Sequence, residues 1–312
     1  MGHTPIRIRT IGPERAITFD LYIFYQQQYL LYRKNGLSLS SPLLKKLKKQ
    51  HIADFYISDL DEINYQQYID AILQEVATST NVSVEEKVHI TESATCNTVE
   101  QMQKNPTTEK AFNMTKKAAR SFCDVITKNP STLKEIFGRQ GGENEALVKH
   151  CLNVCALSIK MAQAEGFSPD EMDIMAIAAL LHDLGISQLA PEHQKLFFKP
   201  RKEFTHEEAK IYNTHPIKSG QLLQDKPYVS KEILDLMHNY GENLQGGGPL
   251  KKKHLSKMEE VLSLVNCYDK KMICYKMTHQ QAIKDLMMSE LGNYNLDKIN
   301  RLKEILKKEG MA

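Results

Sequence analysis

The sequence predicts a mainly α-helical protein that carries a small α/β module at its N-terminus. From about residue 109 almost to the C-terminus, apolar residues recur at the spacing of one helix face. Residues 1–60 instead hold short runs of aromatic and β-branched residues, which favour strands. The chain has 312 residues, 41% hydrophobic and 25% charged, which is typical of a globular protein long enough for two domains.

The N-terminal module is expected to contain three short strands and one helix. Residues 18–25 and 29–33 form two strands on either side of a turn at residues 26–28. A basic amphipathic helix covers residues 43–49, and a third strand covers residues 55–57.

Helical periodicity begins at residues 61–76. Residues 77–110 are polar and lack a clear period, so they could form a helix or a linker. The further helices are expected at 109–127, 131–137, 144–165, 170–184, 206–223, 230–241, 255–273, 279–291 and 296–309. We therefore expect an accessory module with its linker over residues 1–110 and a helical domain over residues 111–312.

Charge, apolar runs and cysteine spacing exclude several classes of protein. The net charge of +3 is too weak to indicate duplex nucleic acid binding. No apolar stretch reaches the roughly 18 residues that cross a bilayer, and residues 1–9 lack the apolar core of a signal peptide. The six cysteines include no CxxC pair. We expect a cytoplasmic protein with reduced thiols and no membrane partner.

The pair His182-Asp183 is the strongest functional signal in the chain. It ends the apolar run 176–181 and precedes Gly185, a residue that commonly ends helices. A buried, charged carboxylate costs several kcal/mol unless it is paired or bound to a metal. The pair therefore predicts a buried polar site at the end of a helix.

His150, His215 and His238 lie on three other predicted helices. Each of them alone would more often be a satisfied core residue than a ligand, but in this order with His182 and Asp183 they indicate a metal centre. Imidazole and carboxylate together suit Fe, Mn, Zn or Ni better than Ca or Mg.

Asp183 is the predicted catalytic residue, because a carboxylate can bridge two ions. Two ions about 3.5–4 Å apart can stabilise both oxygens of an in-line displacement at phosphorus. The predicted chemistry is therefore hydrolysis of a phosphate ester.

The segment Gly246-Gly247-Gly248-Pro249 forms a second cluster, a short distance after His238. Three glycines before a proline make a flexible turn whose backbone can approach a ligand closely. A plain surface turn before the lysine run 251–253 is the alternative.

Ordered motifs along residues 140–308 resemble those of a known family. They are His150, His182-Asp183-Leu184-Gly185, Lys199-Pro200, Glu207-Glu208, His215-Pro216, Gly220, His238, Gly247-Gly248-Pro249, and residues 265–269, 278–282 and 291–292. In this order they resemble the HD-GYP branch of the HD-domain phosphohydrolases. The resemblance implies an all-helical HD-domain bundle that binds two or three metal ions, iron or alternatively manganese, and cleaves cyclic di-GMP to the linear dinucleotide pGpG or to GMP. The N-terminal segment is similar to small accessory domains that often precede such modules.

The chain departs from the family pattern at five positions. Gly248 stands where the motif has tyrosine, Asn239 replaces the second histidine of a pair, and Ile186 replaces a lysine that contacts phosphate. Asn266 occupies the position of a metal-binding aspartate. Ala146 stands where members with three metals carry a glutamate, so we expect two divalent ions here.

The resemblance and these departures define the expected site residues. The expected metal ligands are His150, His182, Asp183, His215, His238, Asn266 and Asp269. The lost phosphate contact could be supplied by Lys199, Lys218 or Lys276, with Gly247 and Gly248 beside the substrate.

Three functions stay open at this point. The retained histidines favour a binuclear phosphodiesterase that acts on cyclic di-GMP. The substitutions favour a catalytically weak or inactive cyclic di-GMP-binding module that works through partners such as diguanylate cyclase-type signalling proteins. Hydrolysis of a related nucleotide is the third possibility.

Overall fold

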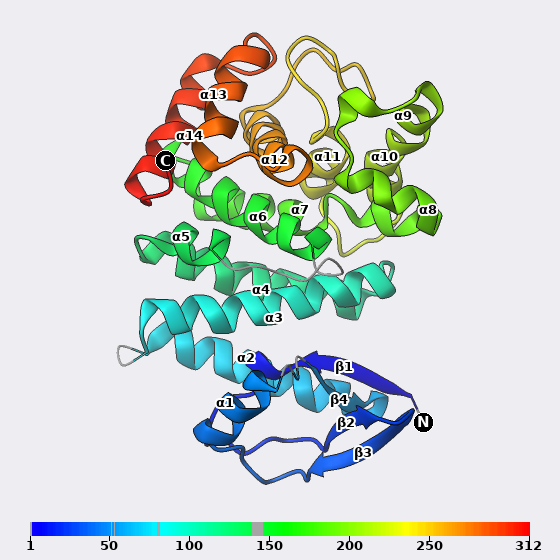
Figure 1. The fold of residues 1–312 in the computed structure, drawn as a ribbon, viewed down its shortest axis with the longest axis vertical. Coiled ribbons are helices and arrows are strands. Elements are labelled where there is room, and N and C mark those ends of the chain that lie inside the picture. Colours follow the sequence, from blue (N-terminus) through cyan, green and yellow to red (C-terminus); the bar gives the residue numbers. More distant parts are fainter. Residues whose placement is uncertain (1, 51, 53, 80–81, 139–145) are drawn as a thin grey trace. The chain divides into compact units, whose positions relative to one another are not determined.

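The computed structural model describes residues 2–50, 52, 54–79, 82–138 and 146–312 and divides into two compact units, Met1–Asn97 and Thr98–Ala312 (Figure 1). This division lies earlier in the chain than residue 110, and the functional boundary between 110 and 111 stays a prediction. None of the described helices is both long and apolar enough to cross a membrane. The predicted fold class, a mainly helical bundle with a small N-terminal α/β module, is confirmed.

A four-stranded antiparallel sheet forms the first unit, in the order β1-β4-β2-β3. Its strands are β1 His3–Arg7, β2 Leu21–Tyr25, β3 Gln28–Arg33 and β4 Asp54–Ser58. The β2–β3 turn is tight because Gln26 and Gln27 both adopt positive φ, 47° and 62°. The sequence did not indicate β1, a short strand at the sheet edge that contains Pro5.

Two helices complete the core of this unit, α1 Ser41–Lys49 and α2 Glu62–Thr78. Phe19 makes edge-on ring contacts with Tyr65 and Tyr68 of α2, at centroid distances of 5.4 Å each. The polar segment that could have been a helix or a linker contains α3, Val84–Lys104. This helix contains the residues at which the two units divide.

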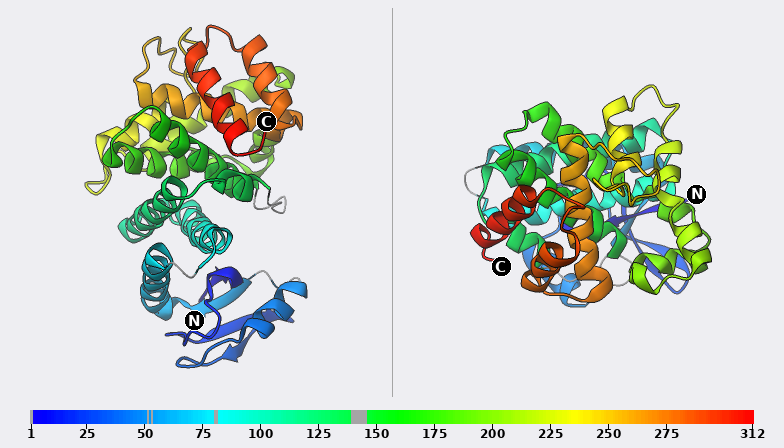
Figure 2. Two further views of the ribbon diagram at one scale, coloured as in Figure 1. Left: turned by 90° about the vertical axis from the view of Figure 1, so that its left-hand side faces the viewer. Right: turned by 90° about the horizontal axis from the view of Figure 1, so that it is seen from above.

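In the part that the structure describes, the second unit is built of helices and loops, and its one β-bridge joins Leu291 and Tyr294 (Figure 2). Its helices are α4 Glu109–Lys128, α5 Thr132–Phe137, α6 Ala146–Ala164, α7 Pro169–Leu181, α8 Pro191–Gln194, α9 His206–Tyr212, α10 His215–Gln221, α11 Lys231–Asn239, α12 Lys257–Tyr275, α13 His279–Ser289 and α14 Leu296–Lys308. The single helix expected over residues 206–223 is wrong, because the chain breaks at residues 213–214 into α9 and α10. Short 3-10 turns fill much of residues 184–203.

Helix α7 lies in the interior of the bundle and carries the predicted site at its end. Every residue from Met175 to Leu181 is buried, which explains the unbroken apolar run in the sequence. Helices α6 and α11 pack against it, and α12 packs against α6. The residues that follow Leu181 are therefore delivered into the core.

The start of α7 is fixed by a capping box. The Glu171 amide donates to the Ser168 hydroxyl at 3.3 Å, and the Ser168 amide donates to the Glu171 carboxylate at 2.8 Å. Pro169 follows at the first helical position, where no amide hydrogen is needed.

Replacing Ser168 by alanine should lower the free energy of unfolding by about 1 kcal/mol, because the Glu171 amide at the start of α7 loses its acceptor. Urea denaturation would measure this loss. Glu171→Gln is the matched control, since an amide side chain can still complete the box and should cost much less. Equal losses in the two variants would contradict a role for the cap.

Candidate metal centre

The carboxylate of Asp183 lies at the middle of the predicted site. His182 caps α7, and Asp183 follows it with almost no exposed surface. One carboxylate oxygen, Oδ2, lies 3.3 Å from Nε2 of His150 and 3.4 Å from Nε2 of His182. The other, Oδ1, lies 3.3 Å from Nε2 of His215. Oδ2 therefore faces two imidazole nitrogens and Oδ1 faces a third, so the two oxygens are directed to separate donors, as those of a bridging carboxylate must be.

The first group of donors, called the first site below, gathers around Oδ2 of Asp183. The Nε2 atoms of His150 and His182 lie 3.1 Å apart, and Nε2 of His150 lies 3.1 Å from Oδ1 of Asn266. The ligand atoms of His150, His182 and Asp183 all lie within 4.8 Å of one another. Oδ2 is buried and accepts no hydrogen bond from the described residues. Such an orphaned anionic atom facing imidazole nitrogens fits a bound cation.

The second group, called the second site, gathers around Oδ1 of Asp183. His215 is the first residue of α10 and is followed by Pro216. The Tyr240 hydroxyl lies 2.5 Å from Oδ1 of Asp183 and 2.6 Å from Nε2 of His215. Sequence reasoning missed Tyr240, whose only signal is its position two residues after His238 at the end of a helix.

The other ring nitrogen of each imidazole is held by an oxygen. Nδ1 of His182 donates to the Ala179 carbonyl at 2.7 Å, and Nδ1 of His215 donates to the Tyr212 carbonyl at 2.5 Å. These bonds place the proton on Nδ1 and leave the Nε2 lone pairs directed into the site, as metal ligation requires.

The ring of His150 is oriented in the same way by the carboxylate of Asp269. Its Oδ2 lies 2.7 Å from Nδ1 of His150, while its Oδ1 accepts from the side-chain Nδ2 of Asn153 at 3.0 Å. Both oxygens are thus engaged on the side of the ring that faces away from the first site. The geometry favours an orienting role for Asp269 over the direct ligation expected from the sequence, whereas Asn266, from the same helix, faces the first site.

Gly185 brings the two halves of the centre together. Its amide donates to the Ser219 hydroxyl at 2.7 Å, and that hydroxyl donates to the His215 carbonyl at 3.0 Å. A Cβ atom at position 185 would lie 2.1 Å from the His215 carbonyl oxygen. Only glycine therefore allows the turn after Asp183 to touch the start of α10.

The electrostatics of the cluster favour an ionised carboxylate. Burial would raise the pKa of Asp183, but the neighbouring imidazoles of His182, His150 and His215 lower it well below its ordinary value. Burial lowers the pKa of His150, but Asp183 and Asp269 outweigh burial and raise it. Burial dominates at His215 and lowers its pKa. A negative, orphaned carboxylate among imidazoles is the donor set of a transition-metal site.

His238 and Asn239 do not join this cluster. A Cβ atom at Gly220 would lie 1.7 Å from Nε2 of His238, so the imidazole packs on that glycine. No hydrogen bond or ion pair links His238 to Asp183 within the described ranges, and its ligation stays a prediction. Asn239 donates to the Glu259 carboxylate at 2.6 Å.

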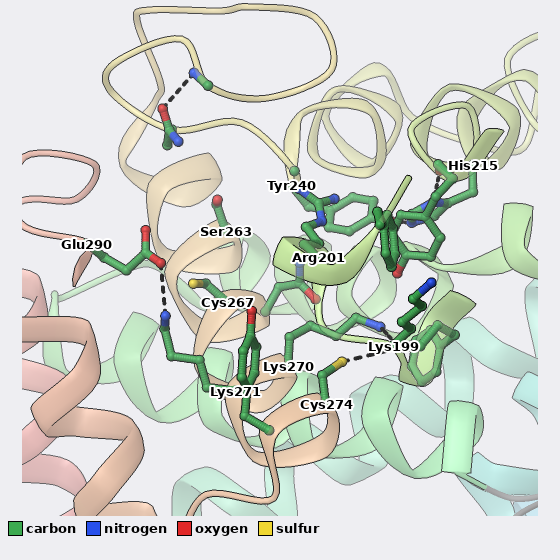
Figure 3. Close-up of a pocket in the computed structure, with 18 of the residues that line it drawn as sticks. Lys199, Arg201, His215, Tyr240, Ser263, Cys267, Lys270, Lys271, Cys274 and Glu290 are labelled. Carbon is green, nitrogen blue, oxygen red and sulfur yellow. Dashed lines mark hydrogen bonds and ion pairs between the residues drawn. The ribbon is translucent and has the colours of Figure 1, made fainter. Parts of the chain in front are cut away.

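A cavity of about 210 Å³ opens beside the second site (Figure 3). His215, Tyr240 and Asn266 line it on the side of the metal centre. Four cationic side chains also line it, namely Lys199, Arg201, Lys270 and Lys271. The cavity therefore suits an anion that reaches toward the predicted metals.

Two of these cations are neutralised by neighbouring carboxylates. Lys199 donates to both carboxylate oxygens of Glu208 at 2.8 Å. Lys271 pairs with Asp285 at 2.7 Å and with Glu290 at 2.9 Å. Both are held in place by these pairs and contribute little net charge to the cavity.

Lys270 and Arg201 have no carboxylate partner in the part of the chain that the structure describes. Nζ of Lys270 donates to the Phe197 carbonyl at 3.1 Å and lies 3.0 Å from the Phe197 ring centroid. Arg201 lies over the Tyr212 ring at 5.5 Å. Burial lowers the pKa of Lys270 to about 8. Sequence reasoning missed both residues, although Lys270 directly follows Asp269.

Only some of the residues predicted to contact the substrate line the cavity. Gly247 and Lys199 line the cavity, whereas Lys218 and the exposed Lys276 do not. A Cβ atom at Gly248 would lie 2.5 Å from the Glu242 carboxyl group, so this backbone has no room for the tyrosine of the motif.

Glu242 closes the glycine-rich loop. Its side chain is fully buried, and its two carboxylate oxygens accept from the amides of Leu250 and Lys252 at 2.6 and 2.8 Å. Within the loop, the Gly247 amide donates to the Asn243 side chain at 2.9 Å. The loop is therefore a hydrogen-bonded rim of the cavity and not a loose surface turn.

Comparisons with known proteins agree with this arrangement. A family model described as HD domain matches residues 101–297. No curated protein matches the chain. Among solved structures, the chain is similar to Bd1817, a HDG"Y"P protein from Bdellovibrio bacteriovorus, with a TM-score of 0.79 and 25% sequence identity. The similarity covers 98% of this chain and 100% of that chain.

Replacing Asp269 by asparagine should weaken metal binding about 10- to 100-fold, because His150 loses the carboxylate that orients it. Asp183→Ala should abolish binding at both sites. Metal titration of the chelator-treated protein would measure both effects. Asp225→Asn, an exposed carboxylate, is the control. Unchanged affinity in Asp269→Asn would contradict the orienting role.

Proposed function

Because the chain belongs to the HD-domain family of metal-dependent phosphohydrolases and is an HD-GYP-type member, we propose that it hydrolyses cyclic di-GMP to pGpG or GMP. One observation carries the proposal. The two oxygens of Asp183 face two separate donor groups, beside a cavity in which two cations have no carboxylate partner among the described residues. This combination suits hydrolysis of a phosphodiester anion.

Two divalent transition-metal ions, iron or alternatively manganese, are proposed as cofactors. His150, His182 and Asn266 would hold one ion and His215 the other, with Asp183 shared between them. Bound there, such ions supply the Lewis acidity and water activation that phosphodiester hydrolysis requires. His238 stays a proposed ligand of the second site.

The chain itself would bind and orient the substrate. Lys270 and Arg201 are proposed to bind the phosphate, since both line the cavity and no carboxylate of the described residues pairs with either. They would replace the lysine lost at Ile186, whose side chain is buried in an apolar cluster with Leu196 and Phe197. Gly247 would let the backbone approach the substrate.

Binding without hydrolysis is the second candidate function. Gly248 has no room for the motif's tyrosine, and the Asn239 side chain is directed to Glu259. A protein of this kind would bind cyclic di-GMP in the cytoplasm and act through partners such as diguanylate cyclase-type proteins.

The first test is incubation of anaerobically purified protein of known metal content with cyclic di-GMP, under iron and then under manganese. Chromatography should detect metal-dependent pGpG or GMP, and Asp183→Ala should lose both metal and product. A parallel panel of related nucleotides would identify a different substrate. Tight binding without product, at two metals per chain, would overturn the enzymatic proposal in favour of the binding function.

Lys270→Met should lower kcat/KM for cyclic di-GMP about 10- to 100-fold, because a charge-assisted hydrogen bond contributes roughly 1.5–3 kcal/mol. Its metal content should stay unchanged. Lys284→Met removes an exposed lysine of α13 and serves as the matched control. Equal kinetics in the two variants would show that Lys270 does not bind the substrate.

A further inference from the structure

Asn239 and Tyr240, two consecutive residues at the end of α11, direct their side chains to different partners. Nδ2 of Asn239 donates to Oε1 of Glu259 at 2.6 Å, and Lys252 donates to the same oxygen at 2.6 Å. This network holds Asn239 outside the metal centre. Tyr240 continues with helical φ and ψ, and its hydroxyl lies in the second site against Asp183.

Tyr240 is held in place by its surroundings. Its side chain is buried, and its ring packs edge-on against His182 at a centroid distance of 4.5 Å and an interplanar angle of 76°. The ring also lies 6.1 Å from that of His215. The phenolic oxygen is thus fixed in the second site by packing as well as by hydrogen bonding.

In the second site, the hydrogen-bond acceptors around the Tyr240 hydroxyl outnumber the hydrogens that can be donated to them. The Tyr240 hydroxyl has one hydrogen but two close acceptors, Oδ1 of Asp183 at 2.5 Å and Nε2 of His215 at 2.6 Å. The His215 proton is already engaged at Nδ1 by the Tyr212 carbonyl. One of the two contacts therefore brings lone pairs together, which is unfavourable in a buried site unless a cation lies among them.

We propose that Tyr240 is a metal ligand of the second site and supplies its phenolic oxygen in place of the histidine that is absent at position 239. The inference rests on the metal-dependent function proposed above and adds a third donor to Asp183 and His215. On binding, the O–H bond breaks, the proton leaves to solvent, and the oxygen forms a bond to the ion. A bound dication favours this ionisation, as it does for other ligands.

Ferric loading tests the proposal without any substrate. The full chain, oxidised after loading with two irons, should show a visible phenolate-to-iron(III) absorption band and tyrosinate vibrations in resonance Raman spectra excited in that band. These are measured on the unchanged protein and do not depend on whether a variant folds. A ferric protein with both irons bound and no such band would overturn the proposal.

Variants then assign the band to one residue. Tyr240→Phe should lose the band and bind one iron instead of two, whereas Tyr240→His should recover the second iron without the band. Tyr212→Phe is the matched control, because it lines the same cavity but its hydroxyl is not within hydrogen-bonding distance of Asp183 or His215 among the described contacts. Retention of the band and of two irons in Tyr240→Phe would contradict the assignment.

The outcome is independent of hydrolysis. A tyrosinate band in a protein that releases no product would leave Tyr240 as a ligand and overturn only the proposed activity. Hydrolysis by a two-iron protein that lacks the band would overturn the ligand and leave the activity.

Discussion

The burial of one charged carboxylate, that of Asp183, is the constraint on which the second unit depends. A carboxylate in the core costs several kcal/mol unless partners surround it. Those partners come from three separate elements, since His150 lies on α6, His215 starts α10 and Tyr240 follows α11. The packing of these helices around α7 is therefore tied to the charge at its end. The apolar run of α7 places the Asp183 carboxylate in the core, and the surrounding polar groups offset the cost of burying its charge.

The three imidazoles differ in what orients them. His182 and His215 each use a carbonyl three residues earlier in the chain, so their ring orientation follows from local backbone structure. His150 instead depends on Asp269, from a helix distant in sequence. The local hydrogen bonds make the orientation of His182 and His215 independent of packing elsewhere, whereas the orientation of His150 depends on how α6 packs against α12.

The sequence predicted most helices because their apolar periodicity is strong, and it predicted the His182-Asp183 pair because charge after an unbroken apolar run is costly. It did not indicate β1, where a short edge strand with Pro5 gives little pattern, nor the break at residues 213–214. Tyr240 and Lys270 were missed for a different reason. Their residue types are common, and only the tertiary packing decides that they point into the centre or its cavity, whereas another lysine, Lys218, does not line the cavity.

Glu242 has a consequence for how a ligand enters. Because its buried carboxylate holds the amides of Leu250 and Lys252, the rim formed by the glycine-rich loop exists before any ligand arrives. Because the rim is already formed, ligand binding would lose little conformational entropy in ordering this loop. Association would then need no reorganisation of this loop, and the attraction between an anion and the cations in the cavity would favour capture. An arriving ligand would therefore meet a rim whose shape is already set by hydrogen bonds within the chain.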